Sequence, residues 1–209
     1  VMDRIHVGPK DSESLRKCKD WVSTRLSLFR SKLGRCHVAP HSIDTPTVDS
    51  GLERAPNERN RVRPPCDDAA LKKMADGYLK QDVIERAART EYNALPMVIH
   101  KPDGSLRPAI NYTGLNAVSQ RDTYPLPNIS ANISKLGRAT YFTCLDLLQG
   151  FLQIELTASS RPKTSFTIGN DQWQFKRMPM GLASSPGAFM RLVDAALRGL
   201  PPGIALAYV

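Results

Sequence analysis

The spacing of apolar residues changes along the chain and predicts different structure in its two parts. In residues 12–34, apolar side chains recur at roughly helical spacing among basic ones, which predicts a helix. Residues 37–65 are rich in Pro, Ser, Asn and Arg without periodicity, as is typical of an extended linker. A clear helix then opens at Asp67, because one apolar stripe is formed by Leu71, Met74, Ala75, Tyr78 and Leu79.

Two hairpins are predicted after this helix. Residues 94–119 have the pattern of a hairpin, in which strand-like residues 95–100 and 106–112 flank the strong turn signal KPDGS. A second hairpin is predicted over residues 164–177, with its turn at Gly169-Asn170-Asp171. Antiparallel pairing is therefore the expected form of the sheet.

Two further helices are indicated by their end signals. Residues 129–136 form a short apolar pattern that Gly137 closes. A longer helix is expected to begin at Ser184 or Ser185, with Pro186 in its first turn, and to end at Gly199. Its buried face is predicted to consist of Phe189, Leu192, Val193, Ala196 and Leu197.

Residues 141–147 and 204–209 are the remaining strand-like runs. Alternation in the first run places Phe142, Cys144 and Asp146 on one face. A carboxylate at a strand end is the ligand type that metal-dependent chemistry requires, and the alternative role is to cap a turn. The second run reaches the last residue, which predicts that this strand is cut short and that partner carboxylates would follow it.

Composition narrows the classes of function. The 209 residues carry a formal net charge of +9, which favours an anionic partner such as nucleic acid, although a basic surface also promotes solubility. The four cysteines form no C-x-x-C pair, so free thiols are expected in place of a zinc ribbon or a disulfide framework. Neither a membrane span nor a signal peptide is indicated, and an intracellular location is expected, in a cytoplasmic particle or the nucleus.

Several blocks of sequence carry a resemblance to a known family. They occur in the order KPDGSLRPAINYTGLN, YPLPNI, YFTCLDLLQGFLQIEL, PKTSF, QFKRMPMGLASSPGAFMRL and AYV. Together they resemble the reverse transcriptase domain of Ty3/Gypsy-type retrotransposon polyproteins over residues 67–209. Residues 41–45, HSIDT, are similar to the segment that joins protease to polymerase in such polyproteins, whereas residues 1–40 show no clear match.

The resemblance implies an α+β fold, the right hand of polymerases. Residues 67–209 would form the fingers and part of the palm, an antiparallel sheet with packing helices, and would end before the second catalytic motif. Residues 1–66 would be a poorly ordered N-terminal extension and linker, similar to the protease–polymerase connector from about residue 41. The helix that begins at Pro186 would pack beneath the palm sheet.

The resemblance also implies a metal site. The family transfers nucleotides with two Mg²⁺ (or Mn²⁺) ions held by three aspartates, one at the end of the first palm strand and two in a Tyr-x-Asp-Asp turn. Asp146 matches the first aspartate, and Leu147 would offer its backbone carbonyl to the same metal. Tyr208 and Val209 match the first two residues of the turn, and its two aspartates are absent from the 209 residues.

Other site residues follow from the same blocks. The residues expected to contact the incoming nucleotide are Lys101, Arg107, Phe151, Met180 and Gly181, of which Arg107 would bind the triphosphate and Phe151 would exclude a ribose 2′-hydroxyl. The residues expected to contact template or primer are Lys163, Ser185 and Pro186. The alternatives are a solvated hairpin arginine for Arg107, core packing for Phe151 and Met180, and a solvated edge residue for Lys163. Leu148 and Leu152 depart from the family pattern, which suggests a divergent copy.

Three functions remain open at this point. The leading hypothesis is a fragment of an RNA-directed DNA polymerase, which acts on an RNA or DNA template with primer and dNTPs in the intact protein and is inactive as these 209 residues. The second is a non-catalytic nucleic-acid-binding remnant. The third is a decayed piece of a retroelement.

Overall fold

The computed structural model describes residues 12–28, 32–135, 137, 142–201 and 203–208. Its helices are α1 (Ser12–Ser23), α2 (Pro46–Asp49), α3 (Pro65–Lys80), α4 (Thr113–Val118), α5 (Ile129–Lys135) and α6 (Ser185–Leu197). Short 3₁₀ turns occur at η2 (Leu26–Leu28), η3 (Gly150–Gln153) and η4 (Pro162–Thr164). The strands are β1 (Ile84–Arg86), β2 (Leu95–His100), β3 (Leu106–Asn111), β4 (Phe166–Ile168) and β5 (Asp171–Phe175).

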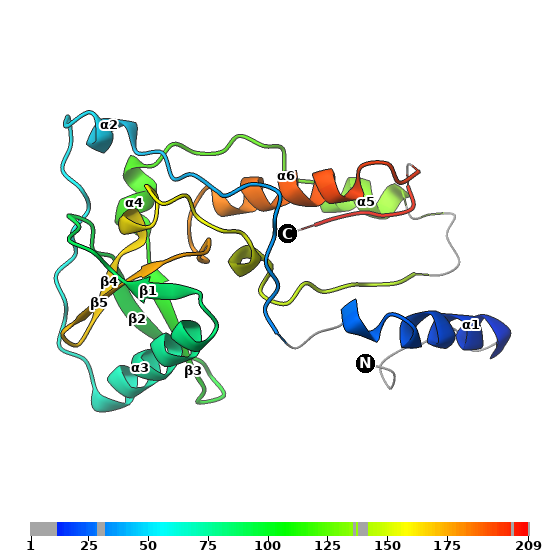
Figure 1. The fold of residues 1–209 in the computed structure, drawn as a ribbon, viewed down its shortest axis with the longest axis horizontal. Helices are drawn as coiled ribbons and strands as arrows, with labels where there is room; N and C mark the ends of the chain where they lie inside the picture. Colours follow the sequence, from blue (N-terminus) through cyan, green and yellow to red (C-terminus); the bar gives the residue numbers. More distant parts are fainter. Residues whose placement is uncertain (1–11, 29–31, 136, 138–141, 202, 209) are drawn as a thin grey trace.

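The strands form two small antiparallel sheets, as the turn signals predict. One has the order β1-β5-β4, and the other is the β2–β3 hairpin. Gly104 and Gly169 lie in the two hairpin turns with positive φ angles of 78° and 61°, a conformation that glycine adopts without steric cost. A parallel bridge between Ala94 and Phe166 joins the sheets, so they act as one support for α3 (Figure 1).

The core lies between α3 and these sheets. Leu71 of α3 and Phe166 of β4 are completely buried, and Phe175 of β5 is nearly so. The Tyr78 ring meets Phe175 edge-on, with ring centroids 5.8 Å apart. The apolar stripe expected on α3 is therefore confirmed as the face that covers the sheets, with Leu71 and Ala75 at its centre, except at Leu79, which is 48% exposed.

The connector between α1 and α3 is extended, as its composition indicates, and it is also part of the core. It runs as a long blue-to-cyan trace past α2 to the start of α3 (Figure 1). Ile43 is only 2% exposed, and its backbone N–H donates to the Ser160 hydroxyl at 2.8 Å. Thr45 is fully buried, and its hydroxyl bonds to Asp49 and contacts the Tyr92 hydroxyl at 3.1 Å. This segment, residues 34–45, is called the strap below.

Two strand predictions are wrong for the described residues. Residues 142–147 and 204–208 form no strand, and the side chains of Phe142, Leu145 and Tyr208 are mostly exposed. A strand is stable only when its backbone groups pair with a neighbouring strand, and no described segment pairs with either run. Tyr141 and Val209, at the ends of the two predicted strands, lie outside the described residues.

The helix predictions are confirmed in position and differ in detail. α5 and α6 lie where their end signals place them, and Gly199 adopts a positive φ of 98° just past α6. Met190 is the most buried large side chain of α6, whereas Ala196, which was expected on the buried face, is exposed. α4 was not predicted, since it was included in the first hairpin. No helix in the described part of the chain is long and apolar enough to cross a membrane.

Candidate nucleotide-binding and catalytic site

The β2–β3 hairpin, which the resemblance assigns to the fingers and which is called the fingers hairpin below, carries the two predicted cationic residues. In its register Arg107 of β3 faces Ile99 of β2, and Lys101 begins the turn with its backbone N–H bonded to the Ser105 carbonyl at 3.0 Å. Both side chains are exposed, so both are available to an anion. Arg107 lies near enough to Tyr78 to act on its phenol, where burial raises the pKa and the guanidinium partly offsets that rise.

The Met180–Gly181 turn is held beside the end of this hairpin. Gly181 has a positive φ of 94°, and a Cβ built on it would lie 3.6 Å from the Ile110 carbonyl oxygen. The Asn116 amide donates to the Gly181 carbonyl at 2.8 Å and accepts from the Ala183 N–H at 2.8 Å. The Met180 side chain is half exposed, so it projects from the turn into solvent and does not pack into the core.

Phe151 lies on η3 and is supported by α6. Its ring meets Phe189 edge-on, with centroids 5.2 Å apart and an interplanar angle of 70°. The chain enters η3 through Gln149, whose φ of 47° is left-handed, and the Gln153 amide donates back to the Leu148 carbonyl at 2.9 Å. These contacts fix the orientation of the Phe151 ring.

Gly150 provides the space for this aromatic pair. A Cβ at Gly150 would lie 2.8 Å from two atoms of the Phe189 ring, which is closer than van der Waals contact allows. We expect Gly150→Ala to lower the free energy of unfolding by about 1–3 kcal/mol, as overpacking does. Gly77→Ala is the matched control, because nothing lies within 4 Å of its added Cβ in the interior of α3. Gly77→Ala should raise the free energy of unfolding by about 0.5–1 kcal/mol. Urea titration of both variants would show that the two substitutions change this free energy in opposite directions.

Asp146 lies in the irregular segment formed by residues 142–147. It is exposed, and its carboxylate makes no hydrogen bond or ion pair with the described residues. Leu147 beside it is 52% exposed. No group of three or more His, Cys, Asp or Glu residues in the described part of the chain is arranged to hold a metal ion. One carboxylate and one carbonyl are too few for a pair of hard cations, so these residues do not form the expected metal site by themselves.

The three residues expected to contact template or primer have structural roles here. The Lys163 ammonium donates to the Ile43 carbonyl at 3.0 Å and pairs with Asp49 at 2.9 Å, and its side chain is 12% exposed. The Lys163 ammonium is therefore not solvated, since the Ile43 carbonyl of the strap and the Asp49 carboxylate of α2 both bind it, and its contact with template or primer stays a prediction. The Ser185 hydroxyl is buried and donates to the Pro179 carbonyl at 3.2 Å. Pro186 lies in the first turn of α6, where its fixed φ suits the helix start.

Two supporting residues were not predicted. Asn116 ends the block that the sequence singles out, but its partners on the Met180–Gly181 turn lie 65 and 67 positions away. Phe189 was predicted only as a core residue of its helix. The supporting roles of Asn116 and Phe189 depend on tertiary contacts. The sequence signal for both residues was that they lie inside the blocks that resemble the family.

His41 fastens the strap to the start of α6. Its Nε2 lies 3.0 Å from the Ser184 hydroxyl. Burial lowers the pKa of His41 and Arg191 lowers it further, whereas the carboxylates of Asp122 and Asp44 act in the opposite direction. The imidazole is therefore held in its neutral form at neutral pH.

This lowered pKa makes stability depend on pH in a defined direction. The unfolded chain binds a proton at His41 near pH 6.5 and the native chain only at lower pH, so acid favours unfolding. We expect the free energy of unfolding to fall as the pH drops below about 6.5, until the native His41 is itself protonated. His41→Gln should reduce this dependence between about pH 7.5 and 5, where aspartates contribute little. Equal slopes for both proteins in urea titrations would contradict the assignment.

Comparison with known proteins identifies the family. A family model described as reverse transcriptase (RNA-dependent DNA polymerase) matches residues 99–209, more than half of the chain. The retrovirus-related Pol polyprotein from transposon opus of Drosophila melanogaster is 41% identical over 125 residues, which are 57% of this chain and 12% of that protein. The corresponding polyprotein from transposon gypsy is 35% identical over 137 residues, which are 63% of this chain and 13% of that protein. The chain thus spans a small part of these relatives.

Solved structures show the same fold. The foamy viral protease-reverse transcriptase in complex with RNA/DNA hybrid matches with a TM-score of 0.83 and 23% identity, covering 100% of this chain and 27% of that one. The same enzyme in complex with dsDNA matches with a TM-score of 0.81 and 24% identity, covering 100% of this chain and 42% of that one. The expected α+β fold of fingers and partial palm is therefore confirmed. The chain belongs to the reverse transcriptase family, and the resemblance to its Ty3/Gypsy-type members is confirmed by the relatives found.

Proposed function

We propose that this chain is the fingers and first palm segment of an RNA-directed DNA polymerase that copies an RNA or DNA template from a primer with dNTPs. The observation that carries the proposal is the joint placement of two sequence blocks. The end of the fingers hairpin at Ile110 and Tyr112 lies against Gly181, and Asn116 bonds to the same turn. Blocks that are far apart in sequence thus meet where a nucleotide pocket would be built.

In this proposal each predicted nucleotide-binding residue has a distinct task. The Arg107 guanidinium offers a planar set of N–H donors that suits the oxygens of a triphosphate, and Lys101 adds a second cation on the same hairpin. Phe151, held by Phe189, would lie under the deoxyribose and exclude a 2′-hydroxyl. Met180 and Gly181 would support the base and the template, since a residue without a side chain allows close approach.

The metal site needs residues beyond those present. Asp146 and the Leu147 carbonyl would contribute ligands, and the remaining carboxylates would come from a Tyr-x-Asp-Asp turn that the 209 residues do not contain. Two Mg²⁺ or Mn²⁺ ions bound there would stabilise the attacking 3′-oxygen and the leaving pyrophosphate. The protein's own share would be the exposed Asp146 carboxylate and the Leu147 backbone carbonyl, which precede the predicted sugar-binding Phe151 by five and four positions in the sequence.

Primer extension tests the polymerase proposal directly. The protein to be assayed is a longer chain in which Tyr208-Val209 is followed by Asp-Asp and by the rest of a reverse transcriptase palm and thumb. It should extend a DNA primer on an RNA template in the presence of Mg²⁺, and the 209-residue chain should not. The absence of extension by a folded longer chain would refute the polymerase proposal. Robust extension by the 209 residues alone would refute the requirement for the Tyr-x-Asp-Asp turn.

Binding without catalysis is the second candidate function, and the net charge of +9 favours it. We expect the 209-residue chain to bind an RNA–DNA hybrid with an affinity that falls steeply with salt, because phosphate contacts release counterions. Arg107→Ala should reduce the slope of log K against log salt by about 1. Arg86→Ala is the matched control, because this exposed arginine lies on the other sheet and pairs with Asp171. Fluorescence anisotropy at several salt concentrations would show equal slopes if Arg107 does not contact the nucleic acid.

A further inference from the structure

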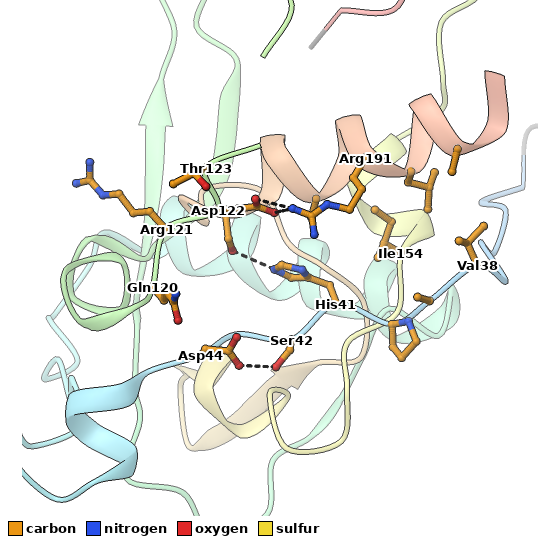
Figure 2. A pocket seen from close by; sticks show the side chains of 16 residues that line it. Val38, His41, Ser42, Asp44, Gln120, Arg121, Asp122, Thr123, Ile154 and Arg191 are labelled. Atoms are coloured by element: carbon orange, nitrogen blue, oxygen red, sulfur yellow. Dashed lines mark hydrogen bonds and ion pairs between the residues drawn. The ribbon is translucent and has the colours of Figure 1, made fainter. Parts of the chain in front are cut away.

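A cavity separate from the proposed nucleotide site lies between the strap and α6. It has a volume of about 530 Å³ and is bounded by strap residues 38–44, by loop residues 120–123 and by one face of α6. Figure 2 shows these segments surrounding it. Pockets for small organic molecules usually fall in the range of about 300–1,000 Å³, so this cavity is large enough for one.

One end of the cavity is polar and contains both donors and acceptors. Figure 2 places Asp44, Ser42 and Gln120 together at this end. The Ser42 hydroxyl donates to one Asp44 oxygen at 2.7 Å, and no described residue bonds to the other oxygen. The Gln120 backbone N–H is bonded to the Asp44 carbonyl, and its exposed side-chain amide can both donate and accept.

The other end of the cavity is apolar. Figure 2 shows Val38 and Ile154 on this side, away from Asp44 and Gln120. Leu192 and Ala195 of α6 complete the apolar wall. A ligand that fills the cavity would therefore set an apolar body against this wall and direct its hydrogen-bonding groups toward the polar end.

The charges around the cavity balance one another. Arg191 donates to both carboxylate oxygens of Asp122, at 2.7 and 3.0 Å, so these two charges are already paired. The remaining formal charges on the lining are those of Asp44 and Arg121, which are opposite in sign. A site without excess charge gives no advantage to an ionic ligand over a neutral one.

We propose that this cavity is a binding site for an uncharged small molecule that has an apolar body and both hydrogen-bond donors and acceptors, such as a nucleoside without phosphate. The proposed polymerase function does not require the site, which lies beside α6 and not at the fingers hairpin. A ligand held there would bridge the strap and α6, two segments that His41 and Ser184 already join. The bound ligand would therefore hold the strap against α6.

Adenosine is the probe, and NMR titration of the 209-residue chain up to about 10 mM is the measurement, since a millimolar site is then occupied. Ala195→Phe places a large ring in the cavity, and it should weaken adenosine binding by at least about tenfold, or about 1.4 kcal/mol. Ala196→Phe is the matched control on the same helix, because Ala196 is exposed and does not line the cavity. The control should bind adenosine as the unaltered chain does.

Gln120→Ala is a second variant, chosen because Gln120 is exposed and its truncation leaves the core intact. It should weaken adenosine binding by about threefold or more, as the loss of a hydrogen bond does. The proposal is overturned if adenosine fails to bind the unaltered chain, or if Ala195→Phe and Ala196→Phe bind it equally well. Binding of adenosine monophosphate about tenfold tighter than adenosine would overturn the neutral class, since it would indicate an anion site.

Discussion

Ile43→Ala should lower the free energy of unfolding by about 2–5 kcal/mol, although the residue lies in a segment that reads as linker. Ile43 is 2% exposed, and its removal leaves a cavity between the strap and residues near Ser160. Small domains are stable by only about 5–15 kcal/mol, so a loss of this size would leave a substantial unfolded fraction under mild denaturant. Urea titration followed by tryptophan fluorescence would measure it.

The reason for so large an effect is the number of separate attachments that the strap makes. The backbone of His41 donates to Glu155 at 2.7 Å and accepts from Thr157 at 3.0 Å, in the manner of an added strand. Lys163 bonds to the Ile43 carbonyl, and the Gln120 N–H donates to the Asp44 carbonyl. Loss of the central apolar anchor weakens all of these contacts together, because they hold one continuous segment.

Val62→Ala is the control for this prediction. Val62 lies in the same connector, is fully exposed and has the same kind of aliphatic side chain. Its truncation should change stability by less than about 0.5 kcal/mol. If Ile43→Ala and Val62→Ala have the same free energy of unfolding, Ile43 does not anchor the strap, and the strap is only a linker.

The sequence predicts the elements whose signals are local. Both hairpins lie where glycine turns and alternating residues place them, and α3 and α6 begin and end near their acidic, serine, proline and glycine signals. These signals act over a few residues, so no knowledge of the rest of the fold is required. The position of Arg107 on β3 could also be predicted locally, because it follows directly from the hairpin pattern.

The remaining features depend on partners that are distant in sequence. The burial of Ile43 depends on Ser160 and Lys163, more than one hundred positions away, and its local sequence resembles a linker. The strand pattern of residues 142–147 is real, but a strand also needs a neighbour, which no described segment supplies. The alternative of a solvated Lys163 is wrong for the same reason, because the strap whose Ile43 carbonyl binds its ammonium was expected to be a linker.

Asp146→Asn should abolish polymerisation in a longer chain that carries the Tyr-x-Asp-Asp turn, with a loss in rate of about a thousandfold or more. Removal of one ligand to a catalytic metal costs several kcal/mol of transition-state stabilisation, and about 4 kcal/mol corresponds to a thousandfold. The substitution keeps the size of the side chain and removes its charge. Primer extension on an RNA template with Mg²⁺ is the measurement.

The structure separates this loss of activity from a loss of folding. Asp146 is exposed and unbonded among the described residues, so Asp146→Asn should leave the free energy of unfolding unchanged within about 0.5 kcal/mol. Asp76→Asn, at an exposed position of α3, is the matched control and should retain full activity. If Asp146→Asn keeps more than about a tenth of the rate, Asp146 does not ligate a catalytic metal.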